Sequence, residues 1–177
     1  MTTEYVTVPN VPLMTVGIEW PGTPGASGST TFALEDLVEM VAAEEDPLIR
    51  AARVKLGHAP WQPHPDGGVV RLGDGDPFWD GEPCFGSVKN LRIDDDGVRL
   101  IGDLVEVPDW LAAVMPSAWP NRSIEWRDHI ETEGGRRYER VLTAVGLLGV
   151  REQAVKDLSD IRRVLDGDPE LVEYPDL

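Results

Sequence analysis

The chain has 177 residues, of which 41% are hydrophobic, and this is the size and composition of one domain with a single core. Its formal net charge of −16 argues against nucleic acid or an anionic membrane surface as the main partner. A single cysteine, Cys84, excludes an intramolecular disulfide and every CxxC zinc or redox motif.

Nothing in the sequence has the pattern of a targeting or membrane segment. The opening stretch "MTTEYVTVPN" lacks the basic region and the apolar region of a signal peptide. No apolar run approaches the roughly 18–20 residues that cross a bilayer. We therefore expect a soluble protein that stays in the compartment where it is made.

The first part of the chain predicts a helix that follows β-like segments. Residues 1–20 are β-like, and residues 21–30 form a Pro/Gly/Ser-rich loop that we expect to be mobile. Residues 30–46 predict a helix with Thr31 as its N-cap. Its apolar residues recur at helical spacing, at Leu34, Leu37, Val38 and Val41.

The next segment is a strand followed by a long loop. Residues 49–60 become strand-like, with Ala52, Val54, Leu56 and His58 alternating with Arg53, Lys55 and Gly57. Residues 61–83 are polar and rich in glycine and proline, which predicts a mobile loop.

The second half of the chain predicts two hairpins and two helices. Residues 84–108 predict a hairpin around Asp94-Asp95-Asp96-Gly97, and residues 122–150 predict another around Gly134-Gly135. Residues 108–119 predict a short helix, and residues 150–167 an amphipathic one before an acidic tail. Hairpins imply antiparallel pairing, so we expect an α+β fold or a barrel with appended helices. We expect one domain over residues 1–157, with residues 158–177 as a helix end and tail.

The common catalytic and metal-binding motifs are absent. The sequence has no GxSxG, HExxH or GxGxxG. The aspartate groups at 94–96 and at 74, 76 and 80 lack EF-hand spacing, so solvated turns explain them better than calcium sites. We expect no metal and no organic cofactor.

The three histidines differ in context. His64 lies in a predicted loop, and His129 is expected to be solvated or salt-bridged. His58 ends an apolar strand face, where it is either a core histidine bonded to backbone or a partly desolvated catalytic base.

Ser123 lies in "PNRSIEW" and admits three interpretations: a nucleophile, a hydroxyl at the start of a strand, or a glycosylation acceptor in Asn121-Arg122-Ser123. The missing secretory signal removes the third. In an extended strand, Ser123, Glu125, Arg127 and His129 share one face, opposite Ile124 and Trp126. A serine nucleophile needs a base and a group that orients it, and Glu125 is either that orienting group or merely a salt-bridge partner of an arginine.

Three segments together carry a family resemblance. They are "VKLGHAP" (54–60), "GSVKNLRIDDDGVRLIGDLVEVPDWLAAVMPSAWPNRSIEW" (86–126) and "RVLTAVGLLGV" (140–150). In this order they resemble the capsid maturation proteases of tailed phages, nearest to the Mu-like protease family and distantly to herpesvirus assemblins. The resemblance covers roughly residues 50–156.

The resemblance implies a serine protease with a compact antiparallel β-barrel surrounded by helices. Such enzymes act in the host bacterial cytoplasm, inside the assembling prohead, on scaffold and major capsid precursors, and usually on themselves. By position, Ser123 matches the nucleophile and His58 the general base. Several relatives carry Glu or His where this chain has Ala144. Glu125 then serves as the third member, a dyad suffices, or the copy is inactive.

Two rival interpretations stay open. The first is a catalytically inactive scaffolding component of the prohead that keeps the protease fold, and Ala144 favours it. The second is an unrelated binding domain in which "NRSIEW" is only a strand. A homo-oligomer is compatible with each of these alternatives.

Overall fold

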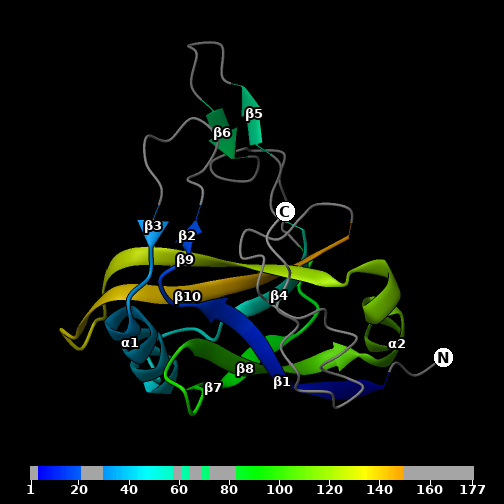
Figure 1. The fold of residues 1–177 in the computed structure, drawn as a ribbon, viewed down its shortest axis with the longest axis horizontal. Helices are drawn as coiled ribbons and strands as arrows, with labels where there is room; N and C mark the ends of the chain where they lie inside the picture. Colours follow the sequence, from blue (N-terminus) through cyan, green and yellow to red (C-terminus); the bar gives the residue numbers. More distant parts are fainter. Residues whose placement is uncertain (1–3, 21–29, 58–60, 64–68, 72–82, 150–177) are drawn as a thin grey trace.

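The computed structural model describes residues 4–20, 30–57, 61–63, 69–71 and 83–149. A six-stranded sheet forms its centre, in the order β1-β8-β7-β4-β10-β9 (Figure 1). These strands are β1 (Tyr5–Thr15), β8 (Arg99–Pro108), β7 (Ser87–Ile93), β4 (Arg53–Leu56), β10 (Arg137–Leu148) and β9 (Asn121–Glu131). Two short pairs, β2 (Glu19–Trp20) with β3 (Thr30–Thr31) and β5 (Trp61–Pro63) with β6 (Val69–Arg71), complete the described strands.

The α+β class is confirmed, but the main sheet is mixed. β4 and β10 run parallel, with Val54 opposite Val145, while the other neighbouring pairs of this sheet are antiparallel. Over the described residues the ladder ends at β1 and β9, so the hydrogen-bonded sheet is open. The antiparallel pairing expected from the hairpins therefore holds for every neighbouring pair of this sheet except β4 with β10.

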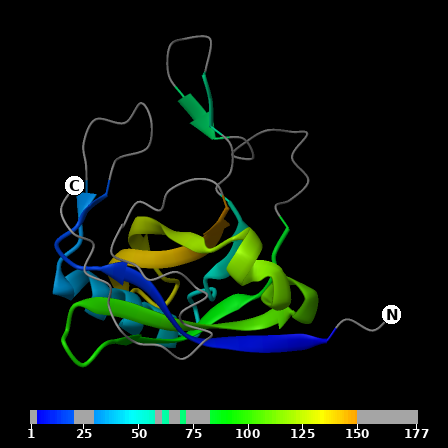
Figure 2. The ribbon, with the colours of Figure 1, turned by 45° about the vertical axis from the view of Figure 1, so that its right-hand side comes forward.

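The sheet curls, so that β9 and β10 pass above β7 and β8 (Figures 1 and 2). The edge strands approach each other at one point, where the fully buried Arg122 of β9 donates its Nε–H to the carbonyl oxygen of Pro12 in β1. The main apolar core fills the interior, beside a smaller cluster around Tyr138 and Val141. It includes Leu13, Val54, Leu104, Ile124 and Val145 from the sheet.

Two helices add side chains to this core. Helix α1 (Leu34–Glu45) contributes Leu37 and Met40, and helix α2 (Asp109–Ala118) contributes Leu111 and Met115. The prediction of α2 is confirmed.

Helix α1 begins later than the sequence indicated, after Ala33. The backbone N–H of Ala33 donates to Asp36 Oδ2 at 2.7 Å, while Thr31 pairs with Glu19 in a strand. Its buried face also differs from the prediction, because Leu34 and Val38 are exposed and Met40 is buried. The periodicity of the sequence predicts a helix, but the packing of the helix against the sheet determines which of its apolar residues are buried.

Both predicted hairpins are confirmed, and their turns show the reason. In the β7–β8 turn, Asp94 Oδ1 accepts the N–H groups of Val98 at 2.8 Å and Arg99 at 2.9 Å, and Gly97 has a φ of +71°. In the β9–β10 turn Gly135 has a φ of +77°. Glycine adopts this left-handed conformation with little steric cost.

Asp103 of β8 forms hydrogen bonds with residues at register shifts in both neighbouring strands. Its carboxylate accepts the N–H of Asn10 in β1 and the side-chain amide of Asn90 in β7, each at 2.9 Å. Both asparagines have positive φ and lie where the strand register shifts. Such bulges increase the local twist of a sheet, which accords with its curl.

Other predictions fall partly or wholly outside the described residues. Within the predicted loop 61–83, β5 and β6 pair as short antiparallel strands, so that part of the loop prediction was wrong. His58, His64, the loop 21–29, the helix 150–167 and the tail lie outside the described residues.

Candidate functional site

Ser123 lies on the outer face of the curled sheet, one row from Glu125. Its cross-strand neighbour on β10 is Gly146, and the next neighbour, on β4, is Lys55. Ile124, one position along, packs in the core on the opposite face. Gly146, which lies between Ser123 and Lys55 in this row, has no side chain. Ser123 is only 5% exposed.

Glu125 forms an ion pair with Lys55. The distance from Lys55 Nζ to Glu125 Oε1 is 2.8 Å, and the two side chains are 4% and 18% exposed. Glu125 lies opposite Ala144, and Ala144 lies opposite Arg53 in turn. The structure therefore brings Glu125 next to a lysine that the sequence did not connect with it.

His58 lies outside the described residues, but the residue before it is described. Gly57 follows β4 and donates its N–H to the carbonyl oxygen of Leu147 at 2.8 Å. Leu147 lies opposite Arg122, the residue before Ser123. The end of β4 and the start of β9 thus lie at the same end of the sheet.

The other residues predicted for this face divide between two environments. Arg127 lines the same pocket as Glu125. His129 instead has a φ of +55° and an exposed side chain, and its Nδ1 lies 2.7 Å from Glu139 Oε2. The expectation of a solvated or salt-bridged His129 is confirmed.

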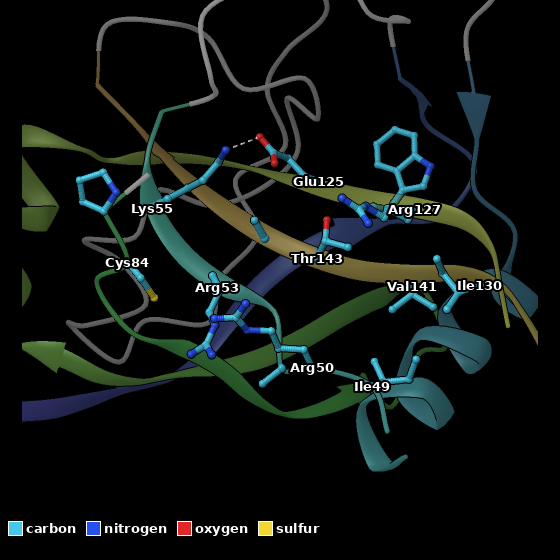
Figure 3. A pocket seen from close by; sticks show the side chains of 14 residues that line it. Ile49, Arg50, Arg53, Lys55, Cys84, Glu125, Arg127, Ile130, Val141 and Thr143 are labelled. Carbon is cyan, nitrogen blue, oxygen red and sulfur yellow. Dashed lines mark ion pairs between the residues drawn. The ribbon is translucent and has the colours of Figure 1, made fainter. Parts of the chain in front are cut away.

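A pocket of about 640 Å³ opens on this outer face (Figure 3). Strands β4, β9 and β10 form its floor, and residues 49–51 and 83–84 form parts of its wall. The polar residues that line it include Arg53, Lys55, Glu125, Arg127 and Thr143 from these strands, and Arg50 from the segment before β4. Ser123 is not among them, but it lies two residues from Glu125 on the same strand face.

Thr143 marks a bulge in β10 beneath this pocket. Leu142 lies opposite Trp126 and Ala144 opposite Glu125, so Thr143 is the extra residue. A bulge changes the direction of nearby side chains and is frequent beside functional sites. Here it lies between the row of Glu125 and the row of Trp126.

Asp46 fixes the turn that leads into the pocket wall. Its Oδ1 accepts the N–H of Leu48 at 2.9 Å, and its Oδ2 accepts the hydroxyl of Tyr138 at 2.9 Å. The hydrogen bond from the Leu48 backbone lowers the pKa of the Asp46 carboxyl, and Tyr138 and Arg136 lower it further against the effect of burial. Ile49 and Arg50, the next residues along, line the pocket.

The sequence did not indicate that Arg53 and Lys55 belong to this site. The alternation in "ARVKLGH" places Arg53 and Lys55 opposite Val54 and Leu56, but gives no reason to connect them with Glu125. That connection depends on the parallel pairing of β4 with β10, for which no local sequence signal exists.

Among the described residues, no three His, Cys, Asp or Glu side chains form a group that could hold a metal ion.

Neither helix of the described part of the chain is long and apolar enough to cross a membrane. Comparison with known proteins adds no identification: no family model, no curated protein and no solved structure matches the chain.

Proposed function

We propose that this chain is a serine endopeptidase that processes scaffold and major capsid precursors during phage prohead maturation. The supporting observation is the cross-strand row of Lys55, Gly146 and Ser123 on the outer face of the sheet, next to a pocket. Together with the ordered segments of the family resemblance, this row supports Ser123 as the nucleophile, two residues from the pocket-lining Glu125 on the same strand face.

In this proposal Ser123 Oγ attacks the scissile carbonyl carbon and His58 accepts the hydroxyl proton. A tetrahedral intermediate forms and collapses as His58 returns the proton to the leaving amine. Water then hydrolyses the acyl-enzyme by the same two steps. We propose Glu125 as the group that orients His58, with Lys55 holding that carboxylate at 2.8 Å.

The proposed setting follows from the same resemblance. The enzyme would act in the host bacterial cytoplasm, inside the assembling prohead, and a homo-oligomer is compatible with that role. The family's compact barrel is supported by the curl of the sheet and by the contact of Arg122 with Pro12, which joins the two edge strands.

The direct test is co-expression with the major capsid protein and its scaffold, followed by intact-mass measurement. We expect the wild type to shorten the precursors and Ser123→Ala to leave them whole, because loss of the nucleophile costs several orders of magnitude in rate. Ser117→Ala is the matched control, since Ser117 is an exposed serine of α2 that bonds only locally. Identical precursor masses for the wild type and Ser123→Ala would contradict the proposal.

A second candidate is an inactive scaffolding component with the protease fold. The observation that favours it is Ala144, which lies opposite Glu125 and offers no group to orient an imidazole. A serine-directed fluorophosphonate separates the two functions. Labelling at Ser123 that disappears in Ser123→Ala supports the enzyme, and unlabelled wild type supports the scaffold.

A further inference from the structure

The pocket concentrates positive charge in a strongly acidic protein. Its described lining holds four of the chain's 16 basic residues and one of its 32 acidic residues. The cations are Arg50, Arg53, Lys55 and Arg127, and the carboxylate is Glu125. The formal net charge of the described pocket lining is therefore positive, whereas the net charge of the chain is −16.

The arginines of the pocket differ from those elsewhere in their partners. Outside the pocket, five described arginines each form an ion pair with a carboxylate, namely Arg92, Arg99, Arg136, Arg137 and Arg140. Within the described residues, no carboxylate forms an ion pair with Arg50, Arg53 or Arg127. Because the chain has twice as many acidic as basic residues, three guanidinium groups without a described carboxylate partner in one pocket are unexpected.

Arg53 is the least exposed of the three arginines in the pocket. Its Nη1 donates to Ser87 Oγ at 2.8 Å, while its buried Nε–H has no hydrogen-bond partner among the described residues. A buried donor without a partner costs free energy that a bound acceptor could recover. Guanidinium groups match the planar geometry of a carboxylate, to which they donate two parallel hydrogen bonds.

Apolar side chains line the pocket beside these cations. They are Ile49, Ile130 and Val141, while Trp126, which also borders the pocket, packs its ring against Phe32 and the core. A volume of about 640 Å³ lies within the range of sites that enclose a small ligand or several side chains of a peptide. An apolar wall with convergent cations suits a peptide with an acidic residue among apolar ones better than it suits a small hydrated anion.

We propose that this pocket binds an acidic side chain of the peptide substrate, next to Ser123. The inference rests on the proposed function, because it makes the pocket a specificity subsite of that enzyme. Glu125 offsets part of the pocket's positive charge and pairs with Lys55, which lies in the same cross-strand row as Ser123.

The test is selection of displayed random dodecapeptides on immobilised full-length Ser123→Ala protein, which binds without cutting. The same selection is made on Ser123→Ala carrying Arg50→Gln and Arg127→Gln. Both arginines are exposed, so this change spares the core, and a thermal melt checks folding. The matched control carries Arg137→Gln, which removes an exposed arginine paired with Glu131 outside this pocket.

We expect Asp or Glu to be enriched at one peptide position with Ser123→Ala and with the Arg137→Gln control. The double pocket variant should lose this enrichment. For a selected peptide, replacing the acidic residue by its amide should weaken binding about tenfold or more, measured by fluorescence anisotropy. No acidic enrichment, or enrichment that survives the double pocket variant, would overturn the proposal.

Selected peptides then go to the wild-type protein to separate the two proposals. If peptide binding depends on Arg50 and Arg127 but the wild type does not cleave the peptides, the result supports the acidic-subsite proposal and counts against the protease proposal. Cleavage that depends on Ser123 but ignores the acidic residue sustains the protease and overturns the pocket proposal.

Discussion

Lys55 and Glu125 are coupled residues at the centre of the candidate site. Their ion pair is 2.8 Å long and mostly withdrawn from solvent, where the attraction between the two charges is screened less than at an exposed site. A cycle of Lys55→Met, Glu125→Gln and the double variant should give a coupling energy of about 1–3 kcal/mol in urea unfolding. Additive effects of the two single changes would show that the pair contributes nothing to stability.

Asp46 makes the stability of the fold depend on pH. Because its pKa is lowered in the folded protein, chiefly by the Leu48 N–H, the folded state holds fewer protons than the unfolded one. The stabilisation is present above the ordinary aspartate value of 3.8 and is lost as the pH falls through the lower, folded-state value.

Asp46→Asn should therefore reduce the free energy of unfolding near neutral pH and flatten its decline in acid. Urea titrations between pH 6 and the acid limit of the native state would measure this slope. The exposed Asp95→Asn in the β7–β8 turn is the control. An unchanged acid slope in Asp46→Asn would count against a role for this carboxylate.

At the scale of elements, Gly86 allows the chain to enter β7 against β8. Its φ is +130°, and a Cβ there would lie 2.5 Å from the carbonyl oxygen of Val105. Its own carbonyl oxygen accepts the N–H of Val54 at 3.0 Å, which links this segment to β4. Both the conformation and the close backbone contact require glycine.

Gly86→Ala should cost roughly 2–5 kcal/mol, the sum of backbone strain and a clash that the chain must move to relieve. Gly97→Ala is the control, because Gly97 also has positive φ but a Cβ there would meet no atom within 4 Å. Its cost should be only about 1 kcal/mol. Equal costs in chemical unfolding would show that the Val105 contact is unimportant.

Elements defined by local chemistry could be predicted from the sequence, and those defined by distant partners could not. The hairpin turns at Asp94–Gly97 and Gly134–Gly135 use side chains and glycines within the turn itself. The parallel pairing of β4 with β10 joins Val54 to Val145, and nothing near either residue specifies the other. The same division holds at the site. The alternation of the strand predicts that Ser123 and Glu125 share a face, whereas the pairing of β4 with β10 brings Lys55 next to Glu125.

For the whole molecule, Arg122 joins the two edges of the curled sheet. It is fully buried and donates to the Pro12 carbonyl oxygen across the gap between β9 and β1. Arg122→Ala should cost about 2–5 kcal/mol, since it leaves a cavity and removes a hydrogen bond from a charged donor.

Hydrogen exchange would locate this effect, with faster exchange expected in β1 and β9. The exposed Arg137→Ala should stay within about 0.5 kcal/mol of the wild type. Unchanged exchange in both edge strands of Arg122→Ala would show that the sheet keeps its curl without this contact.

The parallel pair at the centre of the sheet also sets when the candidate site can exist during synthesis. Lys55 pairs in register with Gly146, which follows it by about half of the chain, and Ser123 is made between them. A domain is made from its N-terminus at about 5–20 residues per second, so Lys55 and Ser123 are both synthesised before the strand that aligns them. A nascent chain therefore has no assembled site until β10 is complete, and any cutting activity begins only with the finished domain.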